Sequence, residues 1–392
     1  SLTPGGERWA QSCVLEIDNT GDVVSHVIIE SVIKSRIQMT YKKVNKWLDE
    51  GIVEDGYAPF TNDLSLMKEL ADIIRHNREA RGAIDFDTDE AKIISDDTGK
   101  PVDVVLRERA SGEKMIEDFM IAANETVASH IFYMDLPFIY RVHGTPKEEK
   151  VNDFLDFISS LGYKITGKVN IKYPSSIENV LSQLKDKKEY KILASLMLRA
   201  MQKAVYQTDN IGHFGLASKI YTHFTSPIRR FPDTTVHRLL RTYLYNNDES
   251  KKTTDYFREY LPQLAEHSSL KERDAIECER EVEDMKMAEY MMDHIGEEFN
   301  GMISGVTSFG MFVELPNMIE GLVHITDIKG DYYNYDERTM SLVGQKTKRR
   351  YRIGDTVTVS CKSASKEEAF IEIEIKKEEV KDEVQEKVKN AG

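Results

Sequence analysis

The sequence has few of the residues that mark secreted, membrane-spanning or zinc-binding proteins. Its three cysteines, Cys13, Cys278 and Cys361, lie far apart and lack the paired spacing of a metal site. We therefore expect free thiols in a reducing compartment and predict a cytoplasmic protein with no membrane partner. No apolar run approaches the ~18 residues of a membrane helix. The first residues also lack the basic and apolar segments of a signal peptide.

The chain also has fewer positive than negative residues: it contains 53 Lys and Arg and 67 Asp and Glu residues, which give a net charge of −14. Such a balance argues at first against a nucleic-acid partner. Phosphate binding depends on local cationic surface, however, and the average charge does not report on it. Composition therefore neither supports nor excludes RNA. With 40% hydrophobic and 31% charged residues, the chain is typical of a globular protein of two or three domains.

The spacing of apolar residues predicts a helix-rich α+β part at the beginning of the chain. Strands are expected within Cys13–Ile37, on either side of the turn at Asn19–Asp22. Helices are expected at about Asn62–Arg81, around Met115–Ile131, and at about Lys147–Leu161, Ile177–Leu184, Lys188–Tyr206, Asp233–Tyr245 and Ser268–His294.

The pattern changes near Gly296, where short β-rich segments separated by glycines begin. Several such strands over about eighty residues predict a small all-β barrel. We therefore divide the chain into a helix-rich domain at 1–295 and a barrel domain at 296–376. Residues 377–392 are dense in mixed charge, and we expect a disordered tail there.

The segment Tyr221–Arg238, YTHFTSPIRRFPDTTVHR, carries the strongest chemical pattern. Pro227 favours a turn, and Arg229 and Arg230 follow it directly. Guanidinium groups match phosphate oxygens and can stabilise charge that develops at a scissile phosphate. Alternatively, both arginines pair with carboxylates, since the chain has many acidic residues. The residues alone leave both interpretations open.

Other clusters of potential metal ligands do not fit a metal site. Asp85–Glu90 begins like a calcium loop, but Glu90 stands where that loop requires glycine, and Asp96 replaces the bidentate glutamate. We expect a solvated turn there. His213, His223 and His237 lack compact zinc spacing, so neutral, hydrogen-bonded histidines are the better interpretation.

The longest motifs resemble the RNB family, the catalytic domain of ribonucleases II and R. The resemblance rests on HFGL followed by YTHFTSPIRRFPD and VHR, and it extends over SLTPGGERWA, RIQMTYKKV, RGAIDFD, MIEDFMIAANETVA and YRVHGTP. The later segment GMISGVTSFGMFVELPNMIEGLVHI resembles an S1 RNA-binding domain of the OB-fold type. Residues 1–295 would then be the C-terminal part of an RNB domain, and 296–376 an S1 barrel. The TSPIRRFPD motif and the charged tail favour the ribonuclease R branch.

The resemblance implies processive, Mg²⁺-dependent hydrolysis of single-stranded RNA from its 3′ end, with release of nucleoside 5′-monophosphates. Arg229 would be catalytic and contact the scissile phosphate. Ribosomes or RNA-decay proteins would be further partners. The residues that would bind RNA in the RNB part are Tyr41, Phe86, Glu117, His213, Arg230 and Glu279.

The barrel adds aromatic and basic candidates for RNA binding. Phe309, Phe312 and His324 fall where an OB fold presents aromatic side chains to bases. The alternative is that the two phenylalanines belong to the barrel core. A basic run interleaved with tyrosines is expected to contact phosphates, and it includes Lys346, Lys348, Arg349 and Arg350.

The acidic motif that holds the metal in this family has no counterpart in the chain, so we assign no metal ligand here. The resemblance places those aspartates upstream of Ser1, and we expect the chain to be inactive by itself. A non-catalytic RNA-binding fragment is the first alternative. The second is an acidic helical scaffold that carries an OB domain and binds no RNA.

Overall fold

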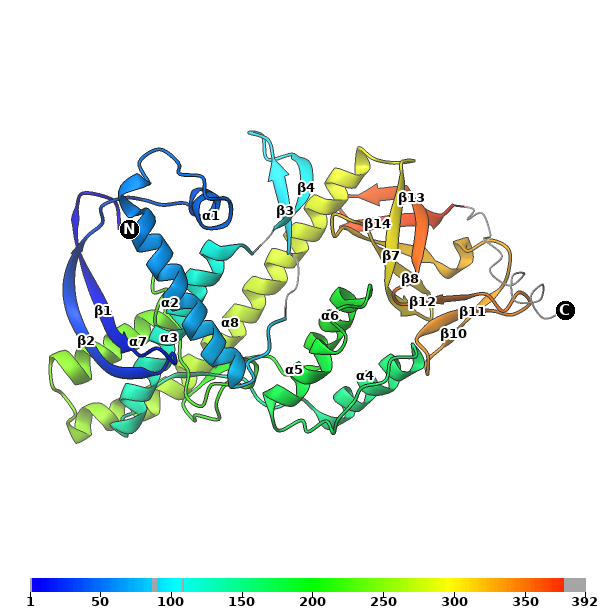
Figure 1. The fold of residues 1–392 in the computed structure, drawn as a ribbon. Coiled ribbons are helices and arrows are strands. Elements are labelled where there is room, and N and C mark those ends of the chain that lie inside the picture. The colour runs from blue at the N-terminus through cyan, green and yellow to red at the C-terminus, as the bar shows by residue number, and fades with distance from the viewer. Residues whose placement is uncertain (1, 87–89, 108, 377–392) are drawn as a thin grey trace.

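The computed structural model describes residues 2–86, 90–107 and 109–376. A helix-rich part is followed by a small β-barrel, and the long helix α8 (Lys251–Met292) runs from the first to the second (Figure 1). The predicted α+β class, with an all-β barrel at the end, is confirmed. The charged segment 377–392 and positions 87–89 of the Asp-rich turn lie outside the described residues.

The first two strands form an antiparallel ribbon at the end of the molecule far from the barrel (Figure 1). They are β1 (Glu7–Ile17) and β2 (Val23–Lys34), so the first begins earlier than the predicted Cys13. The turn between them is held by Asp18. Its carboxylate accepts hydrogen bonds from the backbone N–H groups of Thr20 (2.9 Å) and Asp22 (3.0 Å).

Three helices build the part of the molecule that holds the candidate site: α1 (Tyr41–Glu50), α2 (Thr61–Ala80) and α3 (Ser111–Tyr133). A 3₁₀ turn, η1 (Ala58–Phe60), leads into α2. Of the apolar residues that recur every four positions in α3, Met115, Val127 and Ile131 are buried, whereas Phe119 and Ala123 are half-buried. Because α2 packs along α3, the arginines of one helix face the carboxylates of the other.

The middle of the chain departs from the prediction in two places. A hairpin that we did not expect forms from β3 (Glu90–Ser95) and β4 (Pro101–Arg107). The helix predicted at Lys188–Tyr206 ends at Ala200, because the chain then becomes extended and β6 (Val205–Gln207) pairs with β5 (Tyr140–Val142). The three helices of this region are α4 (Glu148–Ser160), α5 (Pro174–Ser182) and α6 (Tyr190–Ala200).

The motif segment lies between η2 (Phe214–Leu216) and α7 (Phe231–Leu240), which continues into a π-helical turn, η3 (Arg241–Tyr245). Pro232 sits in the first turn of α7, where its missing N–H has no helical partner to lose. Helix α8 begins at Lys251, well before the predicted Ser268. Within the described residues, no helix combines the length and apolar content needed to cross a membrane.

The barrel is closed by five strands in the order β13-β14-β9-β8-β7. Its interior is one hydrophobic cluster with the inner faces of α4–α6, so the barrel packs directly onto the helical part. A short 3₁₀ turn, η4 (Ile325–Asp327), leads to a smaller three-stranded sheet. The strands are β7 (Glu298–Thr307), β8 (Gly310–Glu314), β9 (Glu320–His324), β10 (Tyr333–Asp336), β11 (Ser341–Gly344), β12 (Arg350–Arg352), β13 (Thr356–Ser365) and β14 (Phe370–Ile375).

Candidate functional site

The loop Thr225–Arg230, here called the SPIR loop, is a tight turn that projects Arg229 into solvent. The N–H groups of Arg229 (3.3 Å) and Arg230 (3.1 Å) both donate to the carbonyl oxygen of Ser226. Arg229 is exposed, and its neighbour Ile228 is 85% exposed. Among the described residues, no side chain pairs with the Arg229 guanidinium, so this cation is available to an incoming anion.

The adjacent arginine has the opposite environment. The Nη2 atom of Arg230 donates to Oδ1 of Asp233 at 2.8 Å, and Asp233 is fully buried. The same Oδ1 atom accepts a hydrogen bond from the backbone N–H of Ser226 at 2.7 Å. Of the two arginines predicted to meet RNA, the structure therefore leaves one exposed and holds the other in an internal ion pair.

Beneath the SPIR loop, neutral histidines and tyrosines form a packed platform, which consists of His143, Tyr206, His213, Tyr221 and His223. Burial lowers the pKa of His223 to about 2, and the charges of Arg230 and Arg141 act in the same direction. Burial also lowers the pKa of His213 to about 3, with His143 and Arg141 as further causes. The ring nitrogens act as neutral hydrogen-bonding groups, as at His223 Nδ1, which lies 2.7 Å from the Tyr206 hydroxyl.

Helix α3 is tied to this platform through one buried amide. The Nδ2 atom of Asn124 lies 3.0 Å from the Tyr221 hydroxyl, and its Oδ1 atom accepts the N–H of Phe224 at 2.9 Å. The segment Met115–Asn124 and the SPIR loop are distant in sequence, but this residue makes them one rigid unit. Their relative geometry is thereby fixed before any ligand arrives.

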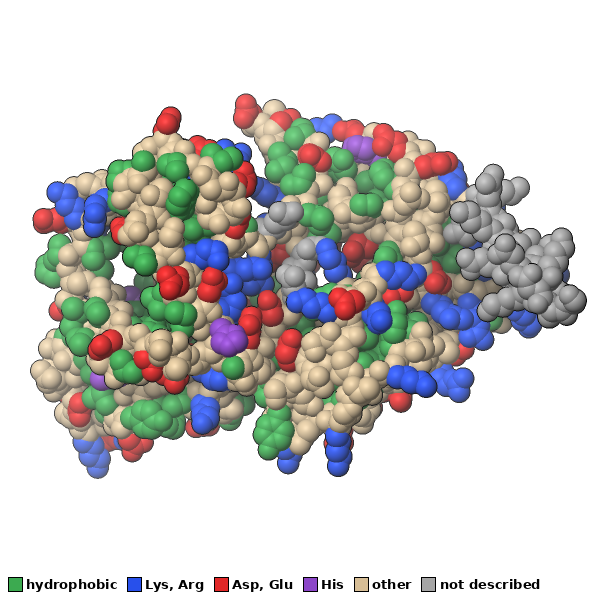
Figure 2. All heavy atoms as spheres, in the orientation of Figure 1, with side chains coloured by type: hydrophobic (Ala, Val, Ile, Leu, Met, Phe, Trp, Pro, Cys, Tyr) green, Lys and Arg blue, Asp and Glu red, His purple; other side chains and the backbone are tan. Residues whose placement is uncertain are grey.

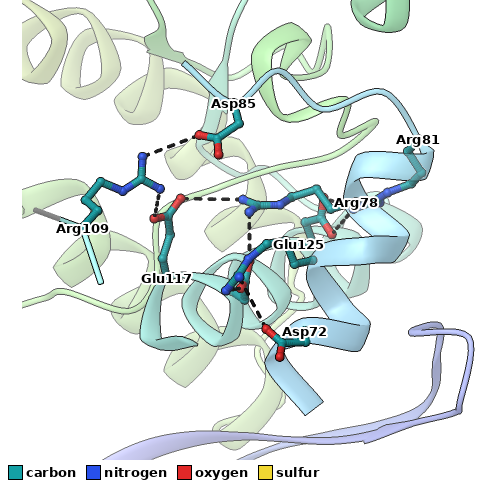
Figure 3. Close-up of polar contacts among 9 residues, drawn as sticks. Asp72, Arg78, Arg81, Asp85, Arg109, Glu117 and Glu125 are labelled. Carbon is teal, nitrogen blue, oxygen red and sulfur yellow. Dashed lines mark hydrogen bonds and ion pairs between the residues drawn. The ribbon is translucent and has the colours of Figure 1, made fainter. Parts of the chain in front are cut away.

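A cavity of about 530 Å³ opens beside the first turns of α3, and its lining includes residues of α2, α5 and α6. Figure 3 shows a network of arginines and carboxylates, part of which lines this cavity: Arg78, Asp85, Arg109 and Glu117. Glu117 accepts from Nη2 of Arg109 at 2.8 Å and lies 3.7 Å from Nη1 of Arg78, while Arg109 Nη1 lies 3.6 Å from Asp85 Oδ1. The predicted RNA-binding residue Glu117 thus lies within a charged network and beside an open space.

Asp118 anchors this network from inside the protein. Its side chain is 1% exposed, and its two oxygens pair with Arg75 at 2.6 Å and Arg78 at 2.9 Å. Burial raises the pKa of Asp118, while Arg78 and Arg75 oppose the shift. The two ion pairs hold Arg78 towards the cavity, where it also faces Glu117.

The remaining candidates of the helical part lie in three places. Tyr41 is exposed at the start of α1, and the next turn of that helix binds the beginning of α3 through the Gly112 N–H, which donates to Asn45 Oδ1 at 2.7 Å. Phe86 directly follows Asp85 at the cavity and is half-buried against the core. Glu279 is exposed on α8. Of the candidates in the helical part, only Glu117 lines the cavity; Phe86 is next to the lining residue Asp85 but packs against the core, and Glu279 does not line the cavity.

The barrel presents its aromatic candidates on the outer surface, not in the core. Along β8, Met311 and Val313 point inward and are fully buried, so the intervening Phe312 points outward. His324 of β9 pairs with Gly310 of β8, which places it on the same face. Phe309 is 47% exposed and meets Phe312 edge to face, with ring centroids 6.1 Å apart.

The basic run is an exposed loop between β11 and β12, held by one carboxylate. Asp331 accepts from the N–H groups of Lys346 (2.9 Å) and Thr347 (2.6 Å), and these hydrogen bonds lower its pKa to about 2. The Arg349 guanidinium lies over the Tyr351 ring, 4.8 Å from its centroid. The four cations predicted to meet phosphate are all exposed: Lys346, Lys348 and Arg349 on this loop and Arg350 at the first position of β12.

The acidic residues near the SPIR loop and the cavity do not fit a magnesium site. Asp233, Glu117 and Asp118 each pair with arginine, and across the described ranges no group of three potential ligands comes together. Mg²⁺ requires several free oxygen donors. We therefore propose a metal-binding role for none of the described residues.

Sequence reasoning missed the cations of the cavity, because none lies in a recognised motif. Arg75 and Arg78 follow a helical i, i+3 spacing, which was the available signal. Asp233 lies three residues after Arg230 and offered the same signal. The other missed cations at the cavity are Arg109, Lys114 and Lys185.

Comparison with known proteins identifies the family of this chain. The model of the RNB domain matches residues 1–246, and that of the S1 RNA-binding domain matches residues 293–376. The chain belongs to the RNB family. It is 44% identical over 379 residues to ribonuclease R 1 of Lactococcus lactis, which covers 95% of this chain and 46% of that protein. Ribonuclease R of Thermotoga maritima is 42% identical, over 93% of this chain and 52% of the relative.

A solved structure agrees with the RNB assignment. RNase R of Mycoplasma genitalium in its apo form superposes with a TM-score of 0.90 at 32% identity, over 96% of this chain and 59% of that one. The same nuclease in complex with ribose-methylated single-stranded RNA gives the same values. The predicted resemblance to ribonuclease R is confirmed, and the chain spans about half the length of the curated relatives it matches.

Proposed function

We propose that the whole protein is a cytoplasmic 3′-to-5′ exoribonuclease that degrades single-stranded RNA processively to nucleoside 5′-monophosphates. The observation that carries the proposal is the exposed Arg229, which no described side chain pairs with, on a SPIR loop held by hydrogen bonds. The chain is similar to ribonuclease R over 95% of its own length. A guanidinium offers two parallel N–H donors to a phosphate and stabilises the charge that develops there during cleavage.

In this proposal the cavity beside α3 receives the 3′ end of the RNA. Phe86 stacks on a terminal base, Tyr41 borders the strand, and Glu117 contacts the terminal nucleotide. Stacking is independent of sequence because every base has a π face, and this suits a general degradative enzyme. The cavity is less acidic than the chain as a whole, whose net charge is −14, because lysines and arginines are interspersed with the carboxylates of its lining. Figure 2 shows Lys and Arg side chains gathered in the hollow between the two parts of the molecule.

The S1 barrel grips the strand before it enters the RNB part. Phe309, Phe312 and His324 offer stacking faces, and the loop that carries Lys346 supplies phosphate contacts together with Arg350. His213, Arg230 and Glu279 remain candidates for RNA contact. Ribosomes and RNA-decay proteins are further proposed partners.

We propose that hydrolysis depends on Mg²⁺, which would supply Lewis-acid chemistry at the scissile phosphate. Asp118, Glu117 and Asp233 are each engaged by arginine, so we propose no metal ligand among them. The 392-residue chain is therefore expected to bind single-stranded RNA without cutting it.

The test is a degradation assay on the full-length protein with 5′-labelled single-stranded RNA and Mg²⁺. The expected result is progressive shortening to one short end product, with nucleoside 5′-monophosphates and few intermediates. Tight binding without hydrolysis would instead support a non-catalytic RNA-binding protein. Internal cleavage would contradict the proposal, because an exonuclease acts only at an end.

A further inference from the structure

The carboxylate of Asp233 joins the two ends of the SPIR loop through a single oxygen. Oδ1 accepts the Ser226 N–H at 2.7 Å and the Arg230 Nη2–H at 2.8 Å. One donor precedes Arg229 by three residues and the other follows it directly. Since both ends of the loop converge on one atom, the position of the loop between them depends on that atom.

The first turn of α7 provides a second attachment to the same loop. The Thr234 hydroxyl donates to the carbonyl oxygen of Pro227 at 2.9 Å. Asp233 and Thr234 are consecutive, so one helical turn binds the loop before and after its apex at Ile228. The helix also places Asp233 in its N-terminal turn, where the macrodipole favours a negative charge.

A contribution to the stability of the fold does not by itself explain these contacts of Asp233. Asp233 is fully buried, and its second oxygen, Oδ2, has no hydrogen-bond partner among the described residues. The same is true of Arg230 Nε and Thr225 Oγ1 on the loop itself. Buried polar atoms without partners cost stability, and a buried ion pair is often no more stable than apolar residues of the same size. Such a cost is characteristic of a functional site.

We propose that Asp233 is the positioning residue of the site: it fixes the SPIR loop so that the Arg229 guanidinium is presented to the scissile phosphate in one orientation. The inference rests on the proposed function of Arg229. Asp233 does not itself touch RNA, because it is fully buried. Its effect is on the geometry of the cation, and small errors of geometry are costly in catalysis.

The first experiment is a double-mutant cycle in the full-length protein, with Asp233→Ala, Arg229→Ala and the pair. Asp233→Ala should lower kcat about 100-fold and leave KM nearly unchanged, on the scale expected for a misplaced catalytic group. Asp233→Asn keeps an acceptor for Ser226 but loses the charge partner of Arg230, so a smaller loss of about 10-fold is expected. In the Arg229→Ala background, Asp233→Ala should cause no further loss of kcat.

The cycle separates positioning from simple destabilisation. A purely structural role would lower kcat equally in both backgrounds, or would lower only the amount of folded enzyme, and either result overturns the inference. The conservative Asp233→Asn and Arg230→Lys variants keep the test possible if Asp233→Ala does not fold. Asp255→Asn is the matched control, because this exposed aspartate on α8 also pairs with an arginine three residues away.

A second measurement does not depend on catalysis and uses the 392-residue chain. A nitroxide is attached at Ile228→Cys, in a background where the exposed Cys278 is replaced by serine. Its electron paramagnetic resonance spectrum should sharpen in the Asp233→Ala variant, because the loop becomes mobile. An unchanged spectrum overturns the inference even if the protein proves not to be a nuclease. A sharpened spectrum without nuclease activity in the full-length protein would leave loop positioning standing and remove only the proposed function.

Discussion

At the scale of single residues, Arg229 and Arg230 show how the same side chain takes two roles. Arg229 is exposed and has no side-chain partner in the part of the chain that the structure describes, whereas Arg230 is held by the buried Asp233. The motif alone could not separate them, because both are guanidinium groups after the same proline. The carboxylate three residues along decides which arginine turns inward.

Replacing Arg229 by alanine in the full-length protein should lower kcat by roughly 100-fold or more, which is the scale for loss of one donor to developing charge. RNA affinity should change little, because the other contacts that we propose would still hold the strand. Single-turnover degradation and fluorescence anisotropy measure the two quantities. Arg258→Ala removes an exposed arginine of α8 and is the control. An equal loss of affinity and turnover would make Arg229 a binding residue only.

Tyr41→Ala and Phe86→Ala should each change the length of the final RNA fragment. Loss of a stacking surface weakens the hold on the last bases, so the enzyme releases a product of different length. Denaturing gels of exhaustive digests measure this length. Tyr173→Ala, which removes another exposed aromatic ring, should leave it unchanged. The same end product in all three variants would count against a stacking role for Tyr41 and Phe86.

At the scale of elements, α2 and α3 are joined by the ion pairs of Asp118 with Arg75 and Arg78. Asp118→Ala should lower the free energy of unfolding by about 3 kcal/mol, because Arg75 and Arg78 lose their buried carboxylate and keep only longer pairs with Asp72 and Glu117. Urea denaturation measures the change. Asp153→Ala, an exposed aspartate on α4, should have little effect. A loss as small as that of the control would show that the arginines find other partners.

The histidine platform beneath the SPIR loop should make stability depend on pH. In the folded state the pKa of His223 is about 2 and that of His213 about 3, against 6.5 for an ordinary histidine. Below pH 6.5 these two histidines become protonated in the unfolded chain but stay neutral in the folded chain. The free energy of unfolding therefore falls as pH drops from 6.5 towards 3, by about 1.4 kcal/mol per pH unit for each histidine.

Urea denaturation of the wild type and of His223→Gln at pH 7.0 and 5.0 tests this dependence. The decrease between the two pH values should be smaller in the variant, because one of the two histidines no longer titrates. Above pH 6.5 neither histidine contributes a slope. The same decrease in both proteins would mean that His223 is protonated in the folded state.

The sequence was enough to predict those helices and strands that form because of the spacing of their own side chains. The four-residue spacing of Met115, Val127 and Ile131 is visible without any partner, and α3 formed as expected. The end of α6 depends instead on β5, a strand distant in sequence that recruits Val205–Gln207. The hairpin β3–β4 was also missed, although its turn at Asp96–Lys100 is closed by the Asp96 carboxylate, which accepts two backbone N–H groups.

The residues of the candidate site could likewise be predicted only where they lie in a recognisable motif. Arg229 and Glu117 lie in motifs, and the structure places one on an exposed loop and the other at a cavity. The arginines around Glu117 come from two other segments and meet only after folding. The sequence left undecided whether Phe309 and Phe312 belong to the barrel core. The strand register settles the point, because Met311 and Val313 take the inward positions.

At the scale of the whole molecule, the net charge of −14 hides a local distribution that suits RNA. Cations lie at the SPIR loop, around the cavity and on the loop between β11 and β12. The S1 barrel is held against the helical part by a common hydrophobic cluster. We therefore expect the barrel and the helical part to act on one strand as a single body.

The most direct test is a titration of the 392-residue chain into 3′-labelled single-stranded RNA, followed by fluorescence anisotropy at several salt concentrations. The logarithm of the association constant should fall linearly with the logarithm of salt, by about 0.7 for each phosphate contacted. The triple variant Lys346→Ala, Lys348→Ala and Arg350→Ala should reduce that slope by about 2. Absence of detectable RNA binding at low salt would contradict the account and leave an acidic scaffold that carries an OB domain.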